Sequence, residues 1–335
     1  MKSRKLPIRG CLLDLHLHLD GAVSVSSARQ LAEIAGISVP ESDEELERML
    51  RVPEDCCSLN EFLERFEFPC SLLQTAEGLR LATENLLREL TAQGIMYAEL
   101  RFAPQKSTDC GLTQEDAVRA VLDGMKTSPI PVRLILCCMR GGNPGDNLET
   151  VSVAAKYRKN GVCAVDLAGA EALFPTSDYR MLMEVAGSLG LPITIHAGEA
   201  AGPDSVRAAL AMGACRIGHG VRACSDPDLV RELAEKQIPL EMCPTSNRKT
   251  CAIADMAEFP LRAFLAAGVC VTVNTDDPSI EGTTEAEELA LVWNEFHLTT
   301  EELRQLLQNA VTASFASEDE KIRMRERIGE EFASL

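Results

Sequence analysis

The chain has 335 residues, 46% of them apolar and 25% charged, which is ordinary for a globular protein with a large core. Its formal net charge of −18 at pH 7 repels nucleic acid and anionic membrane surfaces, so neither is expected as a partner. The expected partner is a small molecule.

The first residues, MKSRKLPIRGCLLDL, contain no apolar signal-peptide core, and no later run approaches the ~20 apolar residues of a membrane span. This predicts a cytoplasmic protein. The thirteen cysteines are odd in number and several lie in apolar runs, so we expect reduced, buried thiols rather than disulfides.

Eight short runs rich in Val, Ile and Leu alternate along the chain with stretches of helical spacing. The runs cover residues 12–20, 96–104, 132–140, 162–169, 192–199, 215–220, 239–247 and 269–277. Nearly continuous apolar strands that alternate with helices are typical of a parallel sheet, and eight such units are typical of a closed barrel. The predicted fold is therefore α/β, a (β/α)8 TIM barrel that occupies residues 1–335 as a single domain.

The first run, within LLDLHLHLDGA, carries two histidines one residue apart. In a strand His16 and His18 point to the same face, with Cα atoms roughly 7 Å apart. This spacing suits two ligands of one metal ion, and it equally suits two strand histidines satisfied by hydrogen bonds. The run alone leaves both interpretations open.

More than 70 residues separate the first two runs, so we expect extra helices inserted after the first strand, over about residues 21–94. A helix is predicted from 26 to Gly36. Within the segment 58–69, Leu59, Phe62, Leu63 and Phe66 follow the i, i+3, i+4, i+7 spacing of an apolar helical stripe. This stripe either packs against the barrel or forms an apolar wall, or lid, over a ligand pocket.

Polar residues gather at the ends of the predicted strands, where barrel enzymes place their active sites. Four of the five histidines of the chain are among them. The residues concerned are His16 and His18 after the first strand, His196 and Glu199 after the fifth, His219 after the sixth, and Asp276 and Asp277 after the eighth. Their convergence favours a metal-dependent active site.

Later in the chain, Thr299 and Glu302 have the spacing of a capping box and predict a helix over 299–310.

Five sequence motifs resemble those of the adenosine deaminase family of the amidohydrolase superfamily in identity, order and spacing. They are LHLHLDGA, HAGE, GHG, CPTSN and NTDDP. The resemblance extends from about Leu13 to the C-terminal helices. It implies one Zn2+ per chain, held by His16, His18, His196 and Asp276, and a hydrolase of purine metabolism.

The resemblance also implies roles for the remaining strand-end residues. Glu199 would donate a proton to purine N1, and His219 would orient the attacking water and help to deprotonate it. Asp277 would help to hold the hydroxide and accept a hydrogen bond from a protonated purine N7. His18 would contact the substrate as well as the metal ion.

Two further positions concern the substrate. The resemblance implies that the backbone N–H of Gly169 reaches purine N3, although Ala170 follows where many relatives carry aspartate. Asp20 matches the aspartate that bonds the ribose 5′-hydroxyl, whereas nucleobase deaminases of the superfamily typically carry glutamate there. The implied substrates are adenosine and 2′-deoxyadenosine, converted to inosine or deoxyinosine and ammonia.

Other functions are weighed against this one. A sister deaminase of adenine or of a 5′-modified adenosine is the nearest alternative. Binuclear amidohydrolases usually carry a lysine at the end of strand four, and VCAVDLAG has none. Deaminases of the cytidine type need H-x-E with P-C-x-x-C, which is absent. A barrel that only binds nucleosides would require the loss of a catalytic group, and none is lost.

Overall fold

The computed structural model describes residues 4–8 and 10–335, and its eight strands pair in parallel in chain order. The strands are β1 Leu12–His18, β2 Ile95–Phe102, β3 Val132–Met139, β4 Val162–Ala168, β5 Thr194–Ala197, β6 Arg216–His219, β7 Leu240–Met242 and β8 Val271–Val273. β1 to β4 form one four-stranded sheet, and β5 to β8 form another. Single bridges join the two sheets, Leu17 to Asp276 and Val165 to Ile193, so the strands close into a barrel.

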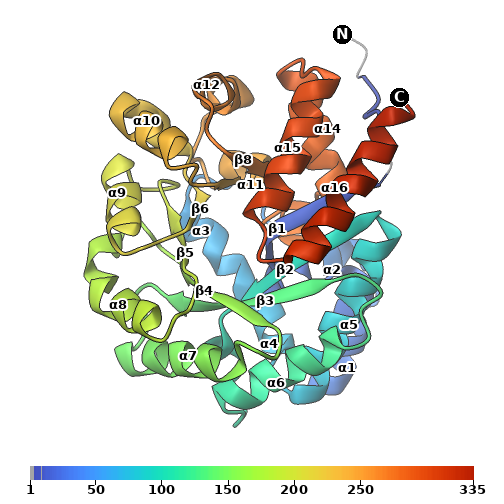
Figure 1. Ribbon diagram of the computed structural model, residues 1–335. Helices are drawn as coiled ribbons and strands as arrows, with labels where there is room; N and C mark the ends of the chain where they lie inside the picture. Colours follow the sequence, from blue (N-terminus) through green and yellow to red (C-terminus); the bar gives the residue numbers. More distant parts are fainter. Residues whose placement is uncertain (1–3, 9) are drawn as a thin grey trace.

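The helices surround this barrel as an outer layer (Figure 1). They are α1 Val25–Ala35, α2 Asp43–Leu50, α3 Leu59–Leu63, α4 Glu67–Leu72, α5 Ala76–Ala92, α6 Gln114–Met125, α7 Pro144–Tyr157, α8 Arg180–Ser188, α9 Pro203–Ala211, α10 Pro227–Glu235, α11 Pro244–Lys249, α12 Leu261–Ala267, α13 Pro278–Glu281, α14 Glu285–Glu295, α15 Thr300–Ala313 and α16 Glu318–Ala333. The predicted fold class, a (β/α)8 barrel with extra helices after the first strand, is confirmed.

The strands are apolar on both faces because one face lines the barrel and the other lies under the helices. Every residue of β1 and of β2 is buried.

Two predicted helix ends also agree with the structure. α1 stops at Gly36, whose φ of 66° is a left-handed conformation that favours glycine, and Thr299 and Glu302 form a capping box at the start of α15.

Two predicted elements differ from the structure. The seventh run was expected to be extended through residue 247, but β7 ends at Met242 and α11 begins at Pro244. Proline lacks an N–H and has a φ suited to the first turn of a helix, so it starts α11.

The stripe 58–69 is not one helix but α3, a 3-10 turn over Glu64–Phe66, and α4. The interruption falls at Glu64–Phe66, around Arg65, because Pro69 cannot donate to the carbonyl of Arg65 four residues earlier and its ring crowds that carbonyl. Within the described residues, no helix is long and apolar enough to cross a bilayer.

Candidate active site

A cavity of about 950 Å³ opens at the carboxyl ends of the strands. Its lining includes all but one of the site residues predicted from sequence, namely His18, Asp20, Gly169, His196, Glu199, His219, Asp276 and Asp277. The exception, His16, is fully buried directly beneath. The structure thus brings together residues from five strand ends that are up to 261 positions apart in the chain.

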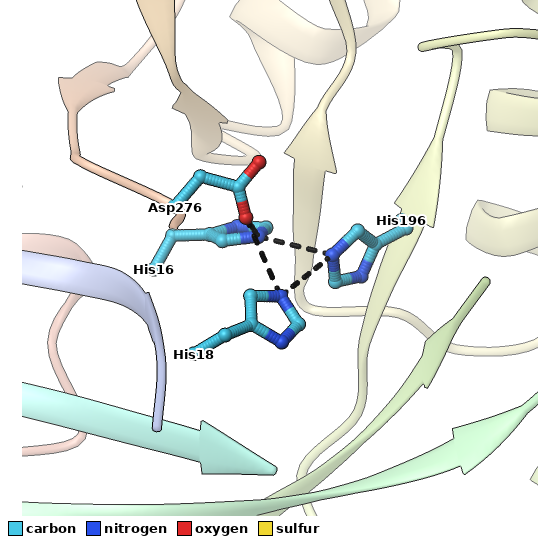
Figure 2. A group of neighbouring side chains, drawn as sticks. All are labelled: His16, His18, His196 and Asp276. Carbon is cyan, nitrogen blue, oxygen red and sulfur yellow. Dashed lines mark hydrogen bonds and ion pairs between the residues drawn. The ribbon is translucent and has the colours of Figure 1, made fainter. Parts of the chain in front are cut away.

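Three imidazoles and one carboxylate point toward a common centre between β1, β5 and β8 (Figure 2). Nε2 of His196 lies 3.0 Å from Nε2 of His16 and 3.2 Å from Nε2 of His18. Oδ1 of Asp276 lies 3.1 Å from Nε2 of His16 and 3.4 Å from Nε2 of His18. Donor atoms bound at about 2.0–2.1 Å to one zinc ion lie within about 4 Å of one another, so the four residues fit such an ion.

Buried carboxylates orient two of these rings. Nδ1 of His16 lies 2.8 Å from Glu241, and Nδ1 of His196 lies 2.9 Å from Asp166. A ring that donates its Nδ1 hydrogen to a carboxylate leaves the Nε2 lone pair free for a metal ion. Arg101 donates to both carboxylates, at 2.8 Å to Glu241 and 3.0 Å to Asp166.

The charges beneath the site keep these carboxylates ionised. Burial by itself raises the pKa of Glu241, but the guanidinium groups of Arg216 and Arg101 hold this pKa well below its usual value. The pKa of Asp166 is likewise raised by burial and brought well below its usual range by His196 and Arg101. Glu241, Asp166 and Arg101 were not predicted from the sequence as supporting residues. Each could have been noticed as a charged residue inside an apolar strand, Arg101 in AELRF, Asp166 in AVDLA and Glu241 in PLEMC.

Glu199 follows β5, and only 4% of its surface is exposed. Its Oε1 accepts a hydrogen bond of 2.8 Å from the hydroxyl of Thr250, and its Oε2 lies 3.6 Å from Nε2 of His219. Its backbone carbonyl accepts from Nε of Arg222 at 2.5 Å, and its backbone N–H donates to Glu171 at 3.1 Å. Groups from three other loops therefore fix this carboxyl.

His219 and Asp277 complete the inner part of the cavity. Nδ1 of His219 lies 3.0 Å from the side-chain amide of Asn247, and its Nε2 faces Glu199 at 3.6 Å and Asp276 at 3.8 Å. Burial, and then the charge of Asp276, raise the pKa of Asp277 well above its usual value. His219 and Asp276 both have left-handed backbone conformations, with φ of 60° and 71°.

Asp20 lies in the 3-10 turn Asp20–Ala22 after β1 and lines the outer part of the cavity. Its Oδ2 accepts a weak hydrogen bond from the Cys70 thiol of α4 at 3.8 Å. Its Oδ1 is buried, lies 4.0 Å from Nδ1 of His18 and accepts no hydrogen bond within the described residues. Burial raises the pKa of Asp20 to about 6. A buried acceptor without a donor is poised for a hydroxyl group of a ligand.

Gly169 follows β4 with a φ of 103°, which disfavours any side chain, and it lines the cavity. The backbone is therefore accessible to a ligand at this position.

The segment 59–72, which we call the lid segment, forms an apolar side of the cavity. Leu59, Phe62, Leu63 and Phe66 all line it. The ring of Phe66 lies 6.4 Å from that of His18, between centroids. Phe62 is 2% exposed and packs with Val52 and Ile280. The stripe therefore does both things that its sequence allowed: it packs against neighbouring segments and it forms a wall.

Known proteins resemble this chain over nearly its full length. The family model of adenosine deaminase matches residues 12–331. The adenosine deaminase of Haemophilus ducreyi is 43% identical over 334 residues, which are 97% of each chain. That of Enterococcus faecalis is 36% identical over 335 residues, which are 99% of this chain and 98% of the relative.

Solved structures share the fold. An adenine deaminase from Arthrobacter aurescens superposes with a TM-score of 0.88 at 28% identity, over 96% of this chain and 98% of its own. An Arabidopsis N6-mAMP deaminase superposes with a TM-score of 0.82 at 26% identity, over 95% of this chain and 97% of its own. A Burkholderia ambifaria amidohydrolase with bound zinc gives a TM-score of 0.87 at 23% identity, over 96% of this chain and 90% of its own. The matched residues 12–331 and the full-length relatives show that the chain belongs to the adenosine deaminase family.

Proposed function

We propose that this protein catalyses the hydrolytic deamination of adenosine, and of 2′-deoxyadenosine, to the corresponding inosine and ammonia. The observation that carries the proposal is the meeting, in one cavity, of a four-residue metal cluster, the buried carboxyl of Glu199 and the unpartnered carboxylate oxygen of Asp20. Full-length relatives named adenosine deaminase support it.

The metal ion of the proposal is one zinc per chain, held by His16, His18, His196 and Asp276. Three imidazole nitrogens and one carboxylate oxygen are donors that zinc accepts, and their spacing suits it. When bound, zinc lowers the pKa of water and so supplies a nucleophile near neutral pH.

The residues around the cluster would move the protons. Attack at purine C6 breaks the aromaticity of the six-membered ring, so the addition needs N1 to be protonated at the same time, and Glu199 is the group that donates this proton. Nε2 of His219 orients the attacking water and takes part in removing its proton. Asp277 helps to hold the nucleophile and accepts a hydrogen bond from a protonated N7, so the purine lies between Asp277 and Glu199.

The substrate is oriented by groups farther out. The backbone N–H of Gly169 donates to purine N3, His18 contacts the bound nucleoside, and Asp20 accepts a hydrogen bond from the ribose 5′-hydroxyl. The lid segment covers the apolar side of the ligand.

A second candidate follows from the solved relatives, which include an adenine deaminase and an N6-mAMP deaminase. Asp20 favours a nucleoside over the substrates of these relatives. Free adenine has no ribose for Asp20 to bind, and the 5′-phosphate of a nucleotide is repelled by its carboxylate.

The experiment that tests the proposal compares adenosine, 5′-deoxyadenosine and adenine as substrates of the parent protein and of Asp20→Ala. Adenosine should be the best substrate of the parent. In Asp20→Ala, kcat/KM for adenosine should fall about 10- to 150-fold, since a hydrogen bond to a charged group contributes about 1.5–3 kcal/mol. The value for 5′-deoxyadenosine should fall less, because that substrate lacks the hydroxyl.

Cys70→Ala is the matched control, since it removes the thiol beside Asp20 and leaves the carboxylate in place. It should retain the preference for adenosine. Equal losses for adenosine and 5′-deoxyadenosine in Asp20→Ala would refute the ribose contact, and faster turnover of adenine by the parent would favour the nucleobase alternative.

A further inference from the structure

One carboxylate organises the loop that carries Glu199. Oε1 of Glu171 accepts from the backbone N–H of Gly198 at 2.7 Å. Oε2 accepts from three successive backbone N–H groups, those of Glu199 at 3.1 Å, Ala200 at 2.7 Å and Ala201 at 2.8 Å. Consecutive N–H groups that converge in this way form a concave anion site, and Glu171 supplies the anion from within the chain.

The loop depends on this acceptor for its shape. Gly198 has a φ of 73°, so the chain leaves the geometry of β5 at that residue and its next N–H groups turn to one side. Backbone donors without a partner are costly where water is excluded, and a single side chain here satisfies four donors, two of them in the buried residues Gly198 and Glu199 and two in partly buried residues.

A buried polar network extends from the same carboxylate. The hydroxyl of Ser205 also donates to Glu171, and it lies 2.6 Å from the hydroxyl of Thr176. Arg140 donates to that hydroxyl at 2.8 Å and to the backbone carbonyl of His196 at 2.7 Å. Glu171 itself is only 2% exposed. Its pKa, which burial raises, is brought below its usual value by the donors around it.

We propose that Glu171 is a positioning residue for deamination, which sets the place of the Glu199 carboxyl by holding the backbone that carries it. The proposal rests on the proposed function, in which Glu199 donates a proton to N1. Glu171 lies two residues after Gly169, so one short loop both offers an N–H to the base and fixes the proton donor on the neighbouring loop. A displacement of a reacting group by about 1 Å can cost about 10²-fold in rate.

A purely structural role is the competing explanation. Glu171 also accepts from Ser205, in the first turn of α9, and could simply tie that helix to the barrel. This role predicts a loss of stability that affects substrate binding, metal content and turnover together. A positioning role predicts a loss in turnover that occurs only when Glu199 is present to donate its proton.

The test begins with Glu171→Gln in the full-length, zinc-loaded protein. An amide has one acceptor oxygen and a donor NH2 group, so at least two of the five donors lose their partner. We expect kcat for adenosine to fall about 10²-fold. The inhibition constant of inosine should change less than about threefold, because product binding does not use the proton of Glu199.

A double-mutant cycle with Glu199→Gln decides whether the loss of kcat in Glu171→Gln depends on Glu199. If Glu171 acts by placing Glu199, adding Glu171→Gln to Glu199→Gln should reduce kcat by less than about threefold further. Multiplicative losses, or equal losses in kcat and inosine affinity, would overturn the positioning role. Near-parental kcat in Glu199→Gln alone would instead contradict the proton donor of the proposed function.

Two further variants complete the test. Ser205→Ala removes one side-chain donor and leaves all four backbone donors, so kcat should stay within about threefold of the parent. Glu171→Asp keeps the charge but is one methylene shorter, and it serves if the glutamine variant does not fold. Its kcat should fall at least tenfold while inosine affinity stays within threefold, and unchanged kcat in this variant would overturn the proposal.

Discussion

Glu199 is anchored at its N–H, its carbonyl and one carboxyl oxygen, so its replacement by glutamine preserves the shape of the site. The amide of Glu199→Gln can still accept from Thr250, but it cannot donate a proton to N1. We expect kcat to fall about 10²–10⁴-fold, the usual loss of a general acid, with zinc retained at one per chain. Steady-state kinetics and elemental analysis measure both, and a kcat close to that of the parent would make Glu199 a bystander.

His196 at the end of β5 and Glu199 just after it could be predicted to lie at the cavity, because both differ sharply from the apolar strand in HAGE. It did not identify Thr250, which bonds Glu199 from the end of α11. Nor did it identify Glu171, whose five donors become neighbours only when the loops after β4 and β5 meet. A hydroxyl or a loop carboxylate has no distinguishing pattern in sequence, and its role depends on a partner that is distant in the chain.

At the scale of elements, the apolar stripe of the lid segment has two functions, packing against neighbouring segments and forming a wall of the cavity, and different side chains serve each. Phe62 is buried with Val52 and Ile280, whereas Phe66 is only partly buried and lies near His18. Phe62→Ala should lower the free energy of unfolding by about 3 kcal/mol, as expected for a buried phenylalanine.

Phe66→Ala is the matched variant. It should raise KM for adenosine severalfold and lower the free energy of unfolding by less than Phe62→Ala does. Denaturant titration and steady-state kinetics of both variants measure this division. Equal losses of stability and unchanged KM in both variants would mean that the segment only packs.

The positions of the elements were predictable because apolar runs and cap residues are local signals, as at Gly36 and Thr299. Their lengths were less so. The expected seventh strand continued through a proline that starts α11, and the stripe of the lid segment is interrupted by a 3-10 turn just before α4, the helix that contains Pro69. In both places the spacing of apolar residues was read correctly, and a backbone constraint imposed by proline decided the conformation.

At the scale of the whole molecule, the proposed metal cluster joins the two four-stranded sheets, since His16 and His18 come from β1, His196 lies in β5 and Asp276 follows β8. Removal of zinc by a chelator should therefore lower the melting temperature as well as abolish turnover, and added zinc should restore both. A ligand present at 100 times its Kd stabilises the folded state by about 2.7 kcal/mol. Calorimetry checks this, and an unchanged melting temperature in verified metal-free protein would contradict it.

The buried acidic groups behind the site make stability depend on pH. Burial raises the pKa of Glu288 from 4.5 to about 7, and Glu288 accepts from the N–H of Thr245 and the hydroxyl of Thr283. The folded state therefore holds this proton more tightly than the unfolded state does. The resulting stabilisation is complete below pH 4.5 and is lost as pH rises through about 7.

Glu288→Gln keeps a side chain that can bond both partners and removes the titration. Relative to the parent, its free energy of unfolding should increase between pH 5 and pH 8, by up to about 3 kcal/mol. Urea titrations at the two pH values measure the difference. A difference that stays constant with pH would show that Glu288 is not the responsible group.

The seam of the barrel has a consequence for synthesis of the chain. β1 meets the segment after β8 through the backbone of three proposed metal ligands, since the N–H of Asp276 donates to the carbonyl of His16 and the carbonyl of Asp276 accepts from the N–H of His18. The side-chain bond of Asn274 to Leu15 crosses the same seam between residues 259 positions apart. At about 5–20 residues per second, a ribosome needs roughly 13 to 50 s to travel that distance. During that interval the edge of β1 that pairs with the segment after β8 is open. The four proposed ligands can meet only when the last strand has been made, so the proposed metal site forms in a single step at the end of translation.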